Sequence, residues 1–325
     1  MTPSTGNASA FTTPFAFTVD ATPPVSSMTW PVDGLFLNAL SSITGTASAA
    51  LSGINKVEVK ITSNDVTGPW WNGSAWVFSE TWRQAQVTGN SWEYPGSTGD
   101  TLFGALQNDL RYIIRSRATD NALNPETAPT TIAVNYDDVA PALNIEVPYP
   151  PPALAYYANA SNANAEWELH RASGDVSDAG LNASGVREVW VAIASGPSFA
   201  ASWDWWSEAT EDFTITGQSS IQWTTQVYTG GSAWQYLPAN LLNGVLDTGV
   251  TYRVFVKARD RAGNWVNNVS NPGVSAAGQT VEFVYDASRP TSTFVLPAAG
   301  ANYKALAEFS GVAADVPDEA SVRLA

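Results

Sequence analysis

The sequence predicts an all-β chain built from tandem β-sandwich modules. Its 325 residues are rich in Gly, Pro, Ser, Thr, Asn and Trp, and they lack the long Leu/Glu/Lys patterns that are typical of helices. Short alternating runs recur between turn residues, as in Val57-Glu-Val-Lys-Ile61, where apolar and charged side chains alternate. The third observation is an internal repeat, which indicates an array of similar modules.

Two segments of the chain share the same landmarks at a constant offset of 140 residues. Residues 106–124 and 246–264 both read Leu-x5-Tyr, then a strand-like run, then Ala-x-Asp-x-Ala-x-Asn. A second landmark, Asp followed four residues later by Pro, starts at Asp20, Asp137 and Asp286. Proline fixes φ and lacks a donor N–H, so these segments predict joints between modules.

The landmarks divide the chain into modules. They predict module one over residues 21–137 and module two over residues 138–286, the latter with a Trp-rich insertion at 198–231. Residues 1–20 resemble the end of a preceding module, and residues 287–325 predict the start of a truncated third module. We therefore expect a segment of a longer protein.

Alternating runs predict the strands of each module. In module one they lie near residues 26–30, 40–47, 55–63, 75–82, 90–95, 110–119 and 130–136. In module two they lie near residues 143–147, 166–173, 186–194, 203–206, 220–228, 232–236, 250–259 and 279–285. This density of short strands is typical of a β-sandwich. The Leu-x5-Tyr pattern predicts tyrosine corners at Tyr112 and Tyr252, with each hydroxyl bonded to nearby backbone.

One extended pattern resembles a known family. Leu-x5-Tyr-x-Val-x-Val-x-Ala-x-Asp-x-Ala-Gly-Asn, followed by Asp-x-x-x-Pro, is similar to the tandem immunoglobulin-like and fibronectin type III-like repeats of giant bacterial surface proteins and adhesins. The resemblance covers nearly the whole chain. It implies Ig-like β-sandwich modules, a place on the bacterial cell surface, and calcium coordination at module joints.

Composition limits the partners. The formal net charge of −15 argues against nucleic acid and anionic membranes, which need a basic surface. It suits a solvated surface protein or the binding of cations. The chain has no cysteine, as is usual for large secreted bacterial arrays, and no apolar run long enough for membrane insertion. We expect an extracellular protein whose partners are other modules of the same long chain, and glycans or neighbouring subunits.

The joint aspartates are candidate metal ligands. In an Ig-like sandwich the first strand enters at the pole where two loops meet, which predicts convergence of Asp137, Asp138, Asp175, Asp178 and Asp260. Crowded carboxylates repel unless a cation separates them, and Ca²⁺ takes about six to eight such oxygens. The first joint offers a weaker set, Asp20 and Asp120, because residues 48–53 contain no acid. The alternative is that these residues only cap turns.

The tryptophans are candidate ligand-binding residues. The chain contains 14 of them, many in the insertion of module two and in a shorter insertion of module one near residues 64–90. Trp70, Trp71, Trp205 and Trp206 are the candidate platforms for sugar rings, because Trp offers a wide apolar face with a polar edge. The alternative is that they fill cores and hold the insertions onto the sandwich.

No residue pattern predicts catalysis. His170 is the only histidine and has no matching nucleophile motif. We therefore predict a non-enzymatic structural or interaction segment of an extracellular bacterial surface fibre, stalk or adhesin. Two alternatives stay open: a carbohydrate-binding accessory region of a secreted polysaccharide-active enzyme, and a subunit of a self-assembling extracellular filament.

Overall fold

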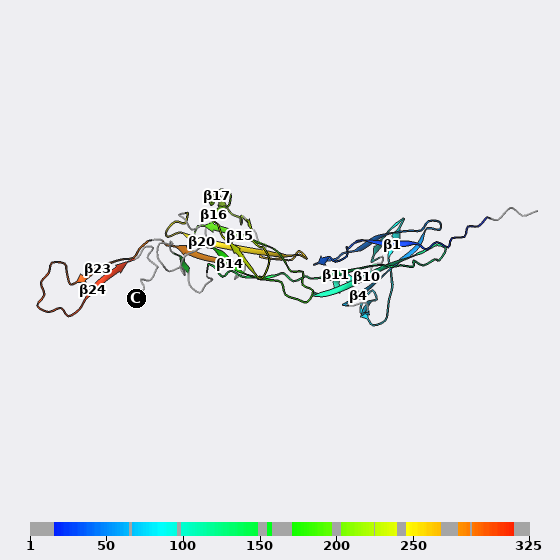
Figure 1. Ribbon diagram of the computed structural model, residues 1–325, viewed down its shortest axis with the longest axis horizontal. Helices are drawn as coiled ribbons and strands as arrows, with labels where there is room; N and C mark the ends of the chain where they lie inside the picture. The colour runs from blue at the N-terminus through cyan, green and yellow to red at the C-terminus, as the bar shows by residue number, and fades with distance from the viewer. Residues whose placement is uncertain are drawn as a thin grey trace, which may run out of the picture. The chain divides into compact units, whose positions relative to one another are not determined.

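The computed structural model confirms an all-β chain (Figure 1). Contacts divide it into two compact units, residues 1–35 with 39–135 and residues 36–38 with 136–325. In the part described, no helix is long and apolar enough to cross a membrane. The structure describes residues 16–64, 67–95, 99–148, 155–157, 171–196, 203–223, 225–238, 245–267, 279–286 and 288–314.

Module one contains two sheets. The first has the order β1 (Val25–Trp30), β3 (Ile43–Ser48), β9 (Ser91–Tyr94) and β8 (Gln86–Thr88). The second has the order β2 (Phe36–Leu37), β11 (Thr130–Tyr136), β10 (Leu110–Asp120), β4 (Ile54–Ser63), β5 (Trp70–Trp71) and β6 (Trp76–Val77). The strand β7 (Arg83–Gln84) also pairs with β4, and a short 3-10 helix η1 spans Leu102–Gly104.

The alternation of side chains explains why these runs form a sandwich. On β4, Val57, Val59 and Ile61 are buried, and on β9 the buried Trp92 and Tyr94 alternate with exposed residues. Successive side chains on a strand point to opposite faces, so each sheet has one apolar face to bury. Burying those faces against each other forms the core.

Module two repeats this plan and adds the strands of an insertion. One sheet has the order β12 (Ala142–Leu143), β14 (Ala172–Ser177) and β19 (Ala233–Tyr236). The other has the order β13 (Ala155–Tyr157), β22 (Thr280–Tyr285), β20 (Thr251–Asp260), β15 (Val186–Ser195), β16 (Trp203–Ser207) and β17 (Asp212–Gln218). The strand β18 (Thr225–Gln226) pairs with β15, and β21 (Trp265–Val266) pairs with β20.

The central sheet of module two is covered on both faces. Val254 and Val256 of β20 belong to the main core, whereas Phe255 between them packs in a second cluster with Trp205 and Ile221 of the insertion. This explains why residues 250–259 alternate less clearly than a strand with one wet face.

Some predicted strands differ from the observed ones. The ranges 75–82 and 220–228 contain only the two-residue strands β6 and β18. The range 166–173 lies mostly outside the described residues, and β14 begins at Ala172. The sequence missed β17, because most of its side chains are exposed and apolar ones are few.

A last pair of strands lies in the predicted third module. β23 (Thr291–Leu296) and β24 (Ser310–Ala314) form a two-stranded antiparallel sheet. Residues 1–15 and 315–325, where the preceding module and the remainder of the third were predicted, lie outside the described residues. The module boundaries stay predictions.

Candidate metal centre

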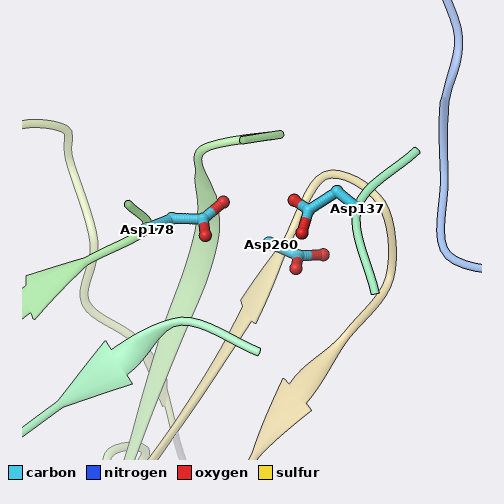
Figure 2. Close-up of side chains that lie close together, drawn as sticks. All are labelled: Asp137, Asp178 and Asp260. Atoms are coloured by element: carbon cyan, nitrogen blue, oxygen red, sulfur yellow. The ribbon is translucent and has the colours of Figure 1, made fainter. Parts of the chain in front are cut away.

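Three carboxylates converge where the chain enters module two (Figure 2). Asp137 follows Tyr136, Asp178 follows the end of β14, and Asp260 is the last residue of β20. One oxygen from each lies within 4.8 Å of the others, and this is the only such group of three among the described residues. Asp137 and Asp260 are buried, and Asp178 is half-buried.

Backbone donors before β15 position two of these carboxylates. The amide of Ser184 donates to Oδ2 of Asp137 at 2.7 Å, and the amide of Gly185 donates to Oδ2 of Asp178 at 2.6 Å. The Ser184 hydroxyl also donates to Oδ2 of Asp178, at 3.3 Å. Gly185 has a φ of 78°, in the left-handed region where a side chain is strained, so glycine allows this turn.

The turn after β20 holds the third carboxylate. The amides of Gly263 and Asn264 donate to Oδ1 of Asp260 at 2.6 and 2.8 Å. The side-chain amide of Asn264 donates to Oδ2 of Asp260 and to the backbone oxygen of Asp137, both at 2.7 Å. Asn264 therefore joins the turn to the segment that enters the module.

The cluster is electrostatically unfavourable for Asp178. Burial raises the pKa of its carboxyl group, and the negative charge of Asp137 raises it further. The hydrogen bond from Gly185 lowers this pKa, and the charge of Asp260 raises it again. Like charges held together in this way favour the neutral form unless a cation compensates them.

Two of the five candidate aspartates lie outside the cluster. Asp138 and Asp175 are both exposed. Asp175 lies between the buried residues Gly174 and Val176 on β14, so alternation directs it to the solvent face. Asp178 is beyond the end of that strand, where alternation no longer governs its direction.

Module one contains the same frame without the third carboxylate. The amide of Ser52 donates to Oδ2 of Asp20 at 3.0 Å. The side chain of Asn124 donates to Oδ2 of Asp120 at 2.8 Å and to the backbone oxygen of Asp20 at 3.0 Å. Residues 48–53 carry no acid, so Asp178 has no counterpart here.

The aspartate pKa values shift in opposite directions in the two modules: they are lowered in module one, whereas that of Asp178 is raised in module two. The hydrogen bond from Thr22 lowers the pKa of Asp20, and that from Ser52 adds to it. Burial acts to raise the pKa of Asp120, but the hydrogen bonds from Asn124 outweigh it and the pKa is lowered. In module one, hydrogen bonds are thus enough to stabilise the charged forms of two carboxylates. In module two the third carboxylate, Asp178, adds repulsion that the hydrogen bonds do not offset.

Sequence reasoning placed Asn124 and Asn264 at the joints but gave no role there to the Ser members of this frame. Their signal was present, because a Ser-Gly pair precedes both strands at Ser52 and Ser184. Asn124 and Asn264 likewise close the two Ala-x-Asp-x-Ala-x-Asn segments. Asp286 makes the same turn bond as Asp20: the Ser288 amide donates to Oδ1 of Asp286 at 2.9 Å, as the Thr22 amide donates to Oδ1 of Asp20 at 3.0 Å.

The donor set of the cluster fits calcium. Two oxygens bound to one Ca²⁺ at about 2.4 Å lie at most about 4.8 Å apart, and the three carboxylates satisfy this limit. All three side chains offer hard oxygens, which favour Ca²⁺ over metals that prefer nitrogen or sulfur. The nearby Arg261 guanidinium donates to the backbone oxygen of Ser184 at 3.4 Å.

The candidate tryptophan platforms are mostly buried. Trp71, Trp205 and Trp206 are exposed by 1%, 0% and 0%, and Trp70 is half-buried. A ring without an accessible face cannot stack on a sugar, so their burial favours the alternative in which they pack the modules.

The strand order decides the fold. The orders β1-β3-β9-β8 and β4-β10-β11 correspond to the ABED and CFG sheets of an immunoglobulin-like sandwich. In module two, β12-β14-β19 and β15-β20-β22 repeat the ABE and CFG parts. The described residues therefore form immunoglobulin-like β-sandwich modules in tandem.

Comparisons with known proteins found similar solved structures but no matching family. No protein-family model matches the sequence, and no curated protein matches it. Among solved structures, the chain is similar to fibronectin(III)-like modules of Clostridium thermocellum CbhA, with 11% identity over 81% of this chain and 95% of that one, at a TM-score of 0.32.

Two further structures show the same level of similarity. A 1.5-MDa bacterial ice-binding adhesin has 14% identity over 86% of this chain and 71% of that one, at a TM-score of 0.33. The FN domains of chicken CNTN1 have 14% identity over 81% and 68%, at a TM-score of 0.33.

Proposed function

We propose that this chain is a structural segment of an extracellular bacterial surface fibre, stalk or adhesin, and that module two binds a calcium ion where the chain enters it. One observation carries the proposal. The Asp–Ser–Asn frame is repeated at the start of both modules, and only in module two does a third carboxylate, Asp178, join it.

The frame connects the incoming chain to the module. Asp137 bonds to the turn before β15 through Ser184, and Asn264 bonds its backbone to the end of β20. These contacts hold three separate segments together. In this proposal Asp137, Asp178 and Asp260 hold the ion, and its charge compensates the three carboxylates.

Composition supports the wider role. The net charge of −15 and the absence of cysteine suit an exposed bacterial surface array. In this proposal the modules act mechanically and without catalysis, by holding a binding surface away from the cell. Labelling of intact cells with an antibody against the chain tests its location, and labelling seen only after lysis would contradict it.

Calcium titration of the metal-stripped protein tests the metal site. The free energy of unfolding should rise as RT ln(1 + [L]/Kd), by about 2.7 kcal/mol at a hundredfold excess over Kd. Mg²⁺ should act more weakly, because its smaller octahedral shell fits a site of several carboxylates poorly. X-ray scattering should show a stiffer chain when calcium is added.

Matched variants test whether the calcium-dependent gain in stability arises at the carboxylate cluster. Asp178→Asn should abolish the calcium-dependent gain in stability, whereas Asp20→Asn in module one should leave the gain unchanged. Melting curves of the parent protein that do not move at millimolar calcium would leave these aspartates as turn-capping residues. That result would remove the metal site and leave the structural role standing.

A further inference from the structure

A buried polar cluster in module one links its first strand to the opposite sheet. Ser26 of β1, Ser116 of β10 and Glu126, which lies between β10 and β11, are exposed by only 2%, 0% and 9%. Oε1 of Glu126 accepts from the amide of Ser26 at 2.8 Å. Oε2 accepts from the Ser26 hydroxyl at 2.7 Å and from the amide of Ala118 of β10 at 2.9 Å. The hydroxyls of Ser26 and Ser116 lie 3.0 Å apart, so one carboxylate and two hydroxyls join β1 to β10.

The backbone of Ser26 is also bonded on the side that faces away from β3. Ser26 pairs with Ala47 of β3, and within the described residues β1 has no second neighbouring strand. The amide of Ser26 donates to Glu126, and its backbone oxygen accepts from the hydroxyl of Thr130, the first residue of β11, at 2.6 Å. Glu126 and Thr130 thus bond the edge of β1 where another strand would otherwise pair.

Tension along the chain would act directly on these bonds. The chain enters module one at β1 and leaves it at β11, and these two strands belong to different sheets. When the ends of the module are pulled apart, detachment of β1 must break its ladder with β3 and the bonds of Ser26. A hydrogen bond needs a donor–acceptor distance of about 2.7–3.2 Å, so it is lost after a small displacement and resists that displacement.

The same three positions are apolar in module two. The sequence offset and the strand pairing give the counterparts of Ser26, Ser116 and Glu126, which are Leu143, Val256 and Val266. All three pack in the main apolar core of module two. Well-packed apolar residues in place of a buried charged group are often neutral or stabilising, so the sandwich does not need a carboxylate here in order to fold.

We infer that Glu126 is a mechanical clamp, which holds β1 in place when the ends of module one are pulled apart. Under tension module one yields by detachment of β1, and the three bonds accepted by Glu126 set the rate of that step. This clamp deepens the mechanical role proposed above. The response to force is a property of the chain itself, so it is tested independently of where the chain is located.

Pulling the full chain in two directions tests the clamp. The chain has no cysteine, so pairs of introduced cysteines can attach the handles at exposed sites. Ala21→Cys with Val139→Cys stretches module one through β1, whereas Phe78→Cys with Val139→Cys bypasses β1. At constant force, Glu126→Gln should raise the unfolding rate about tenfold or more in the first direction, because a charged acceptor of three bonds is lost, and by less than about threefold in the second.

Equal acceleration in the two directions would overturn the clamp, because it would show that Glu126 acts through overall stability alone. Unchanged unfolding in the first direction would overturn it as well.

Two milder variants keep the test decisive if Glu126→Gln folds poorly. Ser26→Ala removes one hydroxyl and keeps the backbone bonds, so it should accelerate unfolding about threefold in the first direction only. Thr29→Ala removes an exposed hydroxyl of the same strand, which bonds to Thr44 at 3.1 Å, and should change neither rate. The same acceleration in Thr29→Ala as in Ser26→Ala would contradict the clamp, because any weakening of β1 would then have this effect.

Discussion

The hydroxyl of Tyr252 accepts a hydrogen bond from the backbone amide of Asp247 at 2.8 Å. Tyr112 accepts one from Gln107 at the same distance, which confirms the two tyrosine corners that the sequence predicts. Burial raises the pKa of Tyr252 to about 12, because the charged phenolate is disfavoured away from water. The hydroxyl therefore stays protonated over the usual pH range.

Removing either hydroxyl should destabilise its module. We expect Tyr112→Phe and Tyr252→Phe each to lower the free energy of unfolding by about 1 kcal/mol, because each buried tyrosine loses its hydrogen bond to the backbone. Tyr303, which accepts from the Ala298 amide at 2.9 Å but is 43% exposed, provides the control, since water replaces its hydroxyl. Urea denaturation measures these differences, and neutral results at both buried sites would contradict the structural role of the corners.

The pKa of Asp178 predicts how metal-free stability depends on pH. Its pKa in the folded state is raised above the ordinary 3.8, so the native state holds this proton more tightly than the unfolded state. Protonation of Asp178 therefore stabilises the fold, and this contribution is complete below the ordinary pKa of 3.8. It is lost as the pH rises through the pKa of the folded state. Asp178→Asn should remove this slope and raise metal-free stability near neutral pH, by at most about 1 kcal/mol because the group is half-exposed.

Denaturation of the parent and the variant in a chelator, between about pH 4 and 7, measures this effect. The matched variant is Asp20→Asn, because the pKa of Asp20 is lowered and its contribution has the opposite sign. Parallel pH profiles for the parent protein and Asp178→Asn would show that repulsion among the three carboxylates is unimportant.

The core tryptophans predict a large loss of stability on truncation. Trp206 is fully buried, donates to the Tyr236 hydroxyl at 2.7 Å and packs edge-on against Phe213. Trp206→Ala should cost about 3–5 kcal/mol through lost burial and the cavity left behind. Phe78→Ala should cost almost nothing, since that side chain is 86% exposed. A small loss in Trp206→Ala, measured by denaturation, would mean that the insertion packs only loosely.

A buried carboxylate in module one predicts a similar sensitivity. Glu126 accepts from the amide and the hydroxyl of Ser26 at 2.8 and 2.7 Å, and from the amide of Ala118 at 2.9 Å. Glu126→Ala should cost about 2–4 kcal/mol because it leaves buried donors without an acceptor. Glu126→Gln retains one acceptor oxygen and should cost less. Equal stability of the two variants would show that water replaces the carboxylate.

Local pattern was enough to predict the repeat and most long strands. The alternation of apolar residues at Val57, Val59 and Ile61 predicts β4, because a sheet with one buried face imposes a period of two on its residues. The constant offset between the Leu-x5-Tyr segments likewise predicted that Tyr112 and Tyr252 have equivalent roles, because the corner depends on residues close in sequence. Strands and tyrosine corners can therefore be predicted from the sequence, because they depend on contacts between residues close in the chain.

The sequence predicted a cluster of carboxylates, but which of the five candidates belong to it required the tertiary structure. Asp175 and Asp178 are three residues apart, yet only Asp178 reaches Asp137 and Asp260. The difference depends on where β14 ends and on the course of the chain to Gly185. Such endings depend on packing between segments distant in sequence.

The sequence by itself determined the class of fold, the tandem repeat and the tyrosine corners, because each follows from residue periodicity or from contacts within a few residues. Only the tertiary structure decided whether Trp205 and Trp206 are buried or exposed. These neighbours point to opposite faces of a sheet, and both are buried because the insertion covers the second face. Whether a face of the sheet is covered depends on residues far along the chain, so a local sequence pattern cannot predict it.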